Sequence, residues 1–269
     1  MGYKPVCFSE CDYGFPELNW RTSVSIDTFN FADTTPFKVF WHIEPDEIKE
    51  TEAKLIKNHA FYDLILSWDV TVLSQCANAK FFPCPGIWTR ESDTSQKSFQ
   101  CSFLTSSKTD TYGHKYRQEI YKRLNRYAGA IPLKLHKSPP LLPDKRSTLV
   151  PFQFSIIMEN CQRPGYFTEK ILDAFATKTI PIYYGCTDIS KFFNMEGILT
   201  FDCWQESRFG SNLFSLLDTL TPDFYESKKA VIEENYQRVM NDYDRGPMVR
   251  LCEAVNEFWQ PKPGQVWGA

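Results

Sequence analysis

The sequence lacks the segments that take a chain to or across a membrane. No stretch approaches the roughly 20 consecutive apolar residues of a membrane-spanning helix, and residues 1–14 lack the apolar core of a signal peptide. Charge of one sign is not in excess either, because 33 acidic and 30 basic residues leave a net charge of −3. We therefore expect a soluble, cytoplasmic protein that does not bind nucleic acid through a general basic surface.

Patterns that bind zinc are also missing. The nine cysteines are an odd number, most of them lie far apart, and no CxxC pair or Cys/His cluster has the spacing of a zinc site. We therefore expect reduced thiols that are mostly buried.

Aromatic residues, in contrast, are abundant at 16% of the chain. Most aromatic side chains pack in protein cores, because they bury large areas, although carbohydrate-handling proteins also place aromatic faces against sugar rings. The length of 269 residues and the 42% hydrophobic content suit two compact α/β units or one large unit. This composition excludes a disordered, collagen-like or coiled-coil chain.

In the first half of the chain, short apolar runs alternate with polar segments. Residues 37–43 and 61–67 are predicted strands, and residues 46–58 and 114–127 are predicted helices. Residues 135–147 hold three prolines and several charges, which is typical of a linker, and we expect a domain boundary there.

The second half has a more regular pattern. Residues 149–158 and 180–184 are predicted strands, and the helix predicted for residues 168–177 lies between them. Alternating strands and helices with short connections are typical of a parallel sheet that is covered on both faces.

Residues 158–173, MENCQRPGYFTEKILD, are the most informative about chemistry. A buried strand leads into a turn with a Pro-Gly pair, and Thr168 is a natural N-cap for the following helix. A helix N-terminus attracts phosphate groups; Lys170 adds positive charge there, and Glu169 can accept hydrogen bonds from sugar hydroxyls. Taken alone, the segment is explained slightly better as a capped helix with a surface Glu-Lys pair.

Residues 152–194 resemble the donor-binding core of the α-1,3-fucosyltransferase family. The family pattern is a strand ending in Phe-Glu-Asn, a variable turn, Tyr-x-Thr-Glu-Lys, and a strand Ile/Val-Pro-Ile/Val followed by Tyr/Trp-Gly. This chain departs from it at Met158, which replaces the Phe, and matches it at Glu159, Asn160, Tyr166, Thr168, Glu169, Lys170, Pro181, Tyr184 and Gly185. A weaker resemblance extends upstream to residue 37.

This resemblance implies a GT-B fold, in which two Rossmann-like α/β domains face each other across a cleft. We expect an acceptor-binding domain in residues 1–140, a donor-binding domain in residues 141–246, and a C-terminal helix in residues 247–269 that packs back on the first domain. Because this sequence shows no anchor or stem, we expect it to resemble the soluble bacterial or viral-type members of the family.

The resemblance also implies roles for individual residues. The family's proposed base is a Glu that ends a strand beside a Pro, and Glu44 fits this description, with Asp69 at a later strand end as the competing base. Arg117 and Lys170 are expected on the diphosphate of the donor. Further donor contacts are expected from Glu169, Tyr166, Asn160 and Thr168, and acceptor contacts from Trp41, His42 and Trp68.

The implied reaction moves a sugar from a nucleotide sugar to a glycan hydroxyl and inverts the anomeric centre. It needs a general base on the acceptor and positive charge on the leaving diphosphate. GT-A enzymes supply that charge with a metal held by Asp-x-Asp at a strand end. The only such tripeptide here, residues 242–244, follows a predicted helical region and is interpreted as a solvated turn. We therefore expect no metal and no cofactor.

Several alternatives remain open at this point. GDP-fucose is the donor implied by the resemblance, and UDP-xylose is the principal alternative, because Met158 replaces the family's Phe. A non-catalytic sugar- or nucleotide-binding module would need Arg117 and Lys170 but not Glu44. A GT-A enzyme is disfavoured by the missing metal motif.

Overall fold

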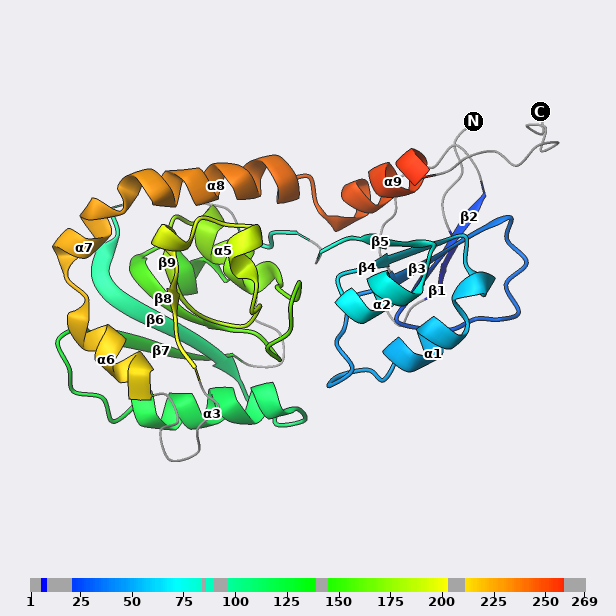
Figure 1. Cartoon of the computed structure of the whole chain (residues 1–269). Helices are drawn as coiled ribbons and strands as arrows, with labels where there is room; N and C mark the ends of the chain where they lie inside the picture. Colours follow the sequence, from blue (N-terminus) through cyan, green and yellow to red (C-terminus); the bar gives the residue numbers. More distant parts are fainter. Residues whose placement is uncertain are drawn as a thin grey trace. The chain divides into compact units, whose positions relative to one another are not determined.

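The computed structural model describes residues 6–8, 21–83, 86–89, 96–138, 145–202 and 211–258. The chain forms two compact units (Figure 1). Unit 1 comprises Met1–Phe82 and Arg245–Ala269, and unit 2 comprises Pro83–Asp244. Each unit contains a five-stranded sheet, and every strand pair in both sheets is parallel.

The sheet of unit 1 has its strands in chain order. The strands are β1 (Val6–Phe8), β2 (Thr22–Ile26), β3 (Phe37–His42), β4 (Leu64–Ser67) and β5 (Ala79–Phe81). Right-handed crossovers between consecutive parallel strands put their connections on one face of the sheet. That face is covered by α1 (Glu52–Lys57) and α2 (Val70–Gln75), which bury Leu55 and Val72 against Phe40 and Ile65. The short 3-10 helix η1 (His59–Phe61) precedes β4.

The other face of this sheet is covered by the last helix of the chain. Helix α9 (Pro247–Phe258) buries Leu251, Cys252 and Val255 against side chains that include Val39 and Trp41 of β3. Figure 1 shows α9 on the side of the sheet opposite to α1 and α2. Because the strand order leaves this face without a crossover helix, α9 supplies the cover that the apolar side chains need.

The sheet of unit 2 has the order β10-β9-β8-β6-β7. Its strands are β6 (Ser98–Ser106), β7 (Leu133–Ser138), β8 (Phe152–Met158), β9 (Ile180–Tyr184) and β10 (Leu199–Thr200). Its helices are α3 (Tyr112–Leu124), α4 (Arg146–Leu149), α5 (Glu169–Ala176), α6 (Ser211–Thr219), α7 (Pro222–Ser227) and α8 (Lys229–Tyr243), with the 3-10 turns η2 (Ile189–Lys191) and η3 (Met195–Gly197).

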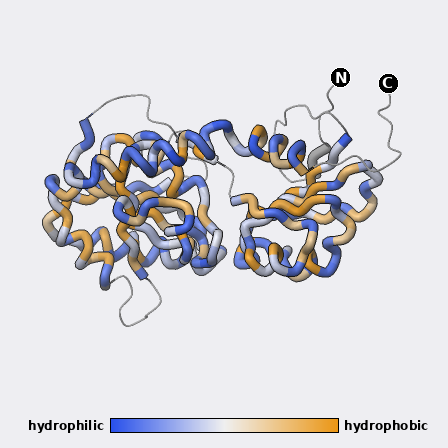
Figure 2. Tube along the Cα trace, turned by 45° about the horizontal axis from the view of Figure 1, so that its top comes forward, coloured by the Kyte–Doolittle hydropathy of each residue, from blue (hydrophilic) through white to orange (hydrophobic). Residues whose placement is uncertain are grey.

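Both faces of this second sheet are buried. One core joins the sheet to α3 and α6, and the other joins it to α5 and α8. All residues of β8 and β9 are buried, and Figure 2 shows hydrophobic residues running through the middle of the unit. The prediction of a parallel sheet covered on both faces is therefore confirmed for this region.

The strand order reverses between β6 and β8. From β6 the chain moves outward through α3 to β7, and it then returns to form β8 on the other side of β6. In open parallel sheets, ligands bind outside the carboxyl ends of the strands at such a switch point. The topology therefore directs attention to the loops that follow β6 and β8.

The predicted boundary between residues 140 and 141 is wrong. Strand β6 pairs with β8, for example at Phe103 and Ile156, so residues 98–138 belong to the same sheet as the segment that resembles the donor core. The division of the chain follows Phe82. The proline-rich stretch connects two strands of one unit. Its composition indicates a loop, but it does not indicate whether that loop separates two domains.

Two other expectations concern cysteine and the membrane. Five cysteines in the described part of the chain are buried, as expected: Cys76, Cys101, Cys161, Cys186 and Cys252. Within the described ranges, no helix combines the length and the apolar character that crossing a bilayer requires.

We expect Leu251→Ala to lower the free energy of unfolding by about 2–5 kcal/mol, because it opens a cavity between α9 and the sheet of unit 1. The matched control is Val249→Ala on the same helix, where the side chain is 39% exposed, and there the loss should stay below about 0.5 kcal/mol. Chemical denaturation measures both values. Equal losses for the two variants would contradict this role of α9.

Candidate functional site

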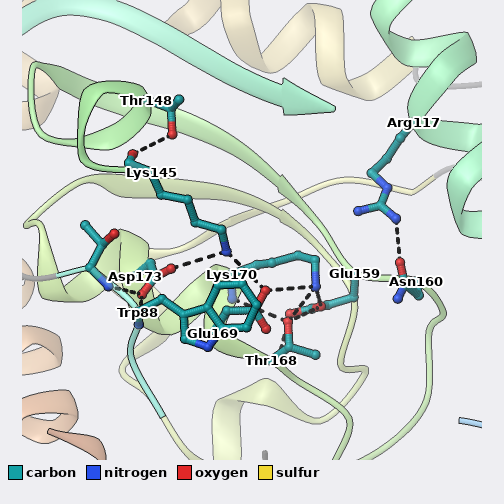
Figure 3. A network of polar contacts seen from close by, with 11 residues as sticks. Trp88, Arg117, Lys145, Thr148, Glu159, Asn160, Thr168, Glu169, Lys170 and Asp173 are labelled. Atoms are coloured by element: carbon teal, nitrogen blue, oxygen red, sulfur yellow. Dashed lines mark hydrogen bonds and ion pairs between the residues drawn. The ribbon is translucent and has the colours of Figure 1, made fainter. Parts of the chain in front are cut away.

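A buried carboxylate, Glu159, lies directly after β8 at the switch point of unit 2. Its side chain is 0% exposed. Its Oε1 accepts a hydrogen bond from the backbone N of Thr168 at 2.9 Å, and its Oε2 accepts one from Thr168 Oγ1 at 2.7 Å. Lys170 Nζ lies 3.3 Å from the same Oε2. Glu159 thus links the end of a strand to the first turn of α5 (Figure 3).

Gly185 explains how this carboxylate fits. A Cβ atom at Gly185 would lie 2.5 Å from Cγ of Glu159 and 2.4 Å from the hydroxyl of Tyr183, both closer than real Cβ contacts. A side chain at this position would therefore displace Glu159 from Thr168. The glycine that directly follows β9 in the motif is therefore required for packing.

Thr168 caps α5, and its hydroxyl has no capacity left for a ligand. Its Oγ1 donates to Glu159 and accepts from Lys170 N at 3.3 Å and Lys170 Nζ at 2.8 Å. A hydroxyl has one proton and two lone pairs, so these three bonds saturate it. Thr168 was expected to contact the donor substrate. In this structure its hydroxyl instead holds Lys170 and Glu159.

Glu169 is ionised because two lysines flank it. Lys145 Nζ lies 3.2 Å and Lys170 Nζ 3.5 Å from its Oε1. Burial by itself raises the pKa of this carboxyl, but Lys170 and then Lys145 outweigh it and lower the pKa to about 2. Glu169 is therefore a pure hydrogen-bond acceptor at neutral pH.

Lys145 also ties the start of unit 2 to α5. Its Nζ lies 3.5 Å from Asp173 Oδ2 and 4.2 Å from the centre of the Trp88 ring. Asp173 Oδ1 accepts from the backbone N atoms of Trp88 and Thr89 at 2.7 and 2.9 Å (Figure 3). Burial raises the pKa of Asp173 to about 6, although Lys145 opposes this shift.

Arg117 reaches the site from α3. Its Nη2 donates to Asn160 Oδ1 at 2.5 Å, which joins two residues that the sequence suggested separately. This approach depends on Gly113, because a Cβ atom there would lie 2.2 Å from the backbone oxygen of Asn160. The N-terminus of α3 therefore packs against the loop after β8, and Arg117 lies one turn further along the helix.

His114 lies in the first turn of α3, among charged side chains. Its pKa is lowered to about 4 by burial and then by Arg117; Asp110 opposes this shift, and Lys108 and Lys170 contribute to it. The positive charges of Arg117 and Lys170 near this turn favour an anion. The N-terminal N–H groups of α3 and α5 add to this effect.

A pocket of about 370 Å³ lies at the carboxyl ends of β9 and β10. Gly185 lines it together with polar side chains that include Gln162, Thr187 and Asn212. A pocket with convergent polar groups is a general property of small-molecule sites.

The expected sugar-contacting aromatics are buried. Trp41, Trp68 and Tyr166 are each 1% exposed, as is His42. Their rings have no face available to a sugar, so these expectations are corrected. The most exposed of the described aromatics are Trp88 at 67% and Tyr112 at 72%, both in unit 2. The sequence pattern could not separate these from core aromatics.

Glu44 and Asp69 both lie at strand ends of unit 1, and their surroundings differ. Asp69 is 3% exposed and caps α2, because its Oδ1 accepts from the backbone N atoms of Thr71 and Val72 at 2.8 and 3.1 Å. Glu44 is half-buried, and its backbone N donates to Asp27 Oδ2 at 3.0 Å. Asp69 therefore has a structural role, which leaves Glu44 as the candidate base.

Sequence reasoning missed Asp27, Lys145 and Asp173. Asp27 directly follows the apolar strand β2, so the rule that singled out strand-end acids could have found it. Asp173 stands among buried apolar residues of α5, which is also a signal. Lys145 falls in the proline-rich stretch and has no local signal.

In the part of the chain that the structure describes, no three His, Cys, Asp or Glu side chains come together as a metal site requires. The Asp-x-Asp tripeptide is not a solvated turn. Its first two residues form the end of α8, and Tyr243 is buried against Phe167 and Phe193.

Comparison with known proteins supports the resemblance seen in the motif. No family model matches the chain. The alpha-(1,3)-fucosyltransferase FucT of Helicobacter pylori is 28% identical over 159 residues, which are 57% of this chain and 30% of that protein. The matched region thus spans less than a third of the length of this curated relative. The resemblance to α-1,3-fucosyltransferases is confirmed.

Solved structures of glycosyltransferases share the fold. A structure of alpha1,3-fucosyltransferase with GDP has a TM-score of 0.52 at 18% identity, covering 87% of this chain and 76% of that one. TarM has a TM-score of 0.55 at 11% identity over 89% and 55% of the two chains. The pneumococcal O-GlcNAc transferase GtfA has 0.50 at 9% identity over 82% and 52%. At these identities the likeness shows the fold, and the expected GT-B class is confirmed.

The buried Asp27 makes stability depend on pH. Burial raises its pKa to about 7, although the N–H groups of Ile43 and Glu44 oppose this shift. The folded chain therefore binds a proton that the unfolded chain releases near pH 4, and stability falls as pH rises from about 4 to 7. We expect a shallower decline in Asp27→Asn, measured by denaturation at several pH values. Parallel curves for the two proteins would contradict the raised pKa.

Proposed function

We propose that the protein is a glycosyltransferase that moves a sugar from a nucleotide-diphosphate sugar to a hydroxyl group of a glycan. The observation that carries this proposal is that Arg117, in the second turn of α3, and Lys170, in the first turn of α5, contact the adjacent residues Asn160 and Glu159 at the switch point of unit 2. Such a site has the charge and the N–H groups that a diphosphate needs.

In this proposal Arg117 and Lys170 hold the diphosphate of the donor and stabilise its charge as it leaves. A guanidinium can bind two phosphate oxygens at once, whereas an ammonium acts as a point charge. The reaction therefore proceeds without a metal ion or cofactor. Glu169, ionised at neutral pH, accepts hydrogen bonds from hydroxyls of the ribose or the sugar, and Asn160 presents its amide beside Arg117.

The second half of the proposal concerns the acceptor. Glu44 takes the proton from the acceptor hydroxyl, whose oxygen then attacks the anomeric carbon of the donor. The bond from that carbon to the diphosphate breaks, and the nucleoside diphosphate leaves with the electron pair. A single displacement of this kind inverts the anomeric centre. Glu44 is favoured over Asp69 because capping occupies the Asp69 carboxylate.

GDP-fucose is the proposed donor, on the basis of the similarity to FucT of Helicobacter pylori. UDP-xylose is the alternative to be tested beside it. Calorimetry with GDP, UDP and the two nucleotide sugars, with and without EDTA, identifies the nucleobase and the sugar of the donor. If none of the four ligands binds, the donor site is wrong, and loss of transfer on chelation would overturn metal independence.

We expect Arg117→Ala to weaken binding of the preferred nucleoside diphosphate about 10- to 100-fold, because a charge-assisted hydrogen bond contributes about 1.5–3 kcal/mol. Arg123→Ala is the matched control, since Arg123 lies on the same helix and pairs with Glu119 at 3.1 Å. Calorimetry gives both dissociation constants. Equal affinities in the two variants would remove Arg117 from the donor site.

Glu44→Gln should lower the rate of transfer by roughly 10²- to 10⁴-fold, as loss of a general base does, and leave the affinity for the donor unchanged. Glu47→Gln, at an exposed acid three residues away, is the control and should keep its activity. NMR of the product gives the anomeric configuration. Retention of configuration, or a near-normal rate in Glu44→Gln, would contradict the proposed displacement. Donor binding without transfer in the unmodified protein would identify a non-catalytic module.

A further inference from the structure

The peptide bond that precedes Glu44 is held at both of its polar ends. Its carbonyl oxygen, on Ile43, accepts from Trp68 Nε1 at 2.8 Å. Its N–H, on Glu44, donates to Asp27 Oδ2 at 3.0 Å, and the N–H of Ile43 donates to Asp27 Oδ1 at 2.9 Å. Two side chains from the neighbouring strand ends of β2 and β4 therefore hold the backbone that follows β3.

Trp68 is fixed in the position from which it makes this bond. Its side chain is 1% exposed, and its ring stacks on His42 with centres 5.6 Å apart and an interplanar angle of 23°. His42 is in turn held by Ser67, whose Oγ lies 3.0 Å from its Nδ1. Packing against His42 therefore fixes the orientation of the indole ring, and its N–H donates to the backbone oxygen of Ile43.

Asp27 occupies a conformation that is costly to maintain. It is 6% exposed, and its φ is +46°, a region that residues other than glycine rarely adopt. Its backbone N also donates to Trp41 O at 3.1 Å, so the surrounding strands define this conformation. Backbone strain and a buried carboxylate both reduce stability, and such features concentrate at functional sites.

We propose that Asp27 and Trp68 are positioning residues that fix the peptide bond before Glu44 and thereby orient the Glu44 carboxylate toward the acceptor hydroxyl. This inference rests on the role of Glu44 in the proposed function. A general base must lie within hydrogen-bond reach of the proton that it removes. A displacement of a catalytic group by about 1 Å can lower the reaction rate about 10²-fold. A mobile backbone before Glu44 would therefore lower the rate of transfer.

Trp68→Phe tests the proposal, because it removes the N–H donor and keeps an aromatic ring against His42. We expect kcat to fall about 10- to 100-fold, while the KM for the donor, which binds to unit 2 in this proposal, stays within about twofold. A variant that was only destabilised would lose active protein, which thermal denaturation and active-site titration with the nucleotide would reveal. An unchanged kcat in folded Trp68→Phe would overturn the role of Trp68.

Asp27→Asn is the second variant. Asparagine tolerates a positive φ and keeps one acceptor oxygen, so it removes one of the two backbone hydrogen bonds and the charge. The matched control is Asp63→Asn. Asp63 directly precedes β4, and its Oδ2 accepts from the backbone N of Lys38, at the amino end of β3, at 2.9 Å. We expect kcat to fall in Asp27→Asn and to stay within about twofold in Asp63→Asn. Equal losses in both would indicate a general effect on the sheet.

A double-mutant cycle with Glu44→Gln separates positioning from stability. If Trp68 acts through the Glu44 carboxylate, Trp68→Phe should cost less than about twofold in kcat once that carboxylate is gone, because coupled residues are not additive. Additive losses would overturn the inference. If Glu44→Gln alone keeps full activity, the proposed base is wrong, whereas an inactive Glu44→Gln with a fully active Trp68→Phe would leave the base in place and reject only the positioning role.

Discussion

The proposed donor site depends on one buried interaction, the contact of Glu159 with Thr168 and Lys170. A carboxylate without exposed area needs hydrogen bonds and an opposite charge, and Thr168 and Lys170 supply both from the first turn of α5. In return, Glu159 determines where α5 begins and where the Lys170 ammonium lies. Gly185 is part of the same arrangement, because only a residue without Cβ leaves room for the Glu159 side chain.

Charge balance in unit 2 follows from this arrangement. Lys170 is shared between Glu159 and Glu169, and Lys145 is shared between Glu169 and Asp173. Each of the three carboxylates therefore has a lysine ammonium beside it in a place where burial opposes its charge. Arg117 donates a hydrogen bond to a neutral partner, Asn160. An arginine beside an amide can turn to an incoming anion at lower cost than one that must leave a carboxylate.

Unit 1 is governed by a different constraint, its strand order. Strands in chain order leave one face of the sheet without crossover helices, and α9 covers that face although it comes from the far end of the chain. The carboxyl ends of β2, β3 and β4 then bring Asp27, Glu44 and Trp68 together. Asp27 lowers the folding stability at neutral pH. Such a residue is expected where the orientation of a functional group, here Glu44, matters more for activity than stability does.

The sequence by itself determined the alternation of strands and helices in the second half and, through the motif, the GT-B class, because periodicity and local capping depend on neighbouring residues. Residues such as Thr168 and Lys170 were found for the same reason. Only the tertiary structure decided that the first segment of unit 1 ends at Phe82, that Trp41 and Trp68 are buried, and that Asp27, Lys145 and Asp173 join the polar networks. Strand pairing and burial depend on contacts between segments far apart in the chain, which composition and spacing do not encode.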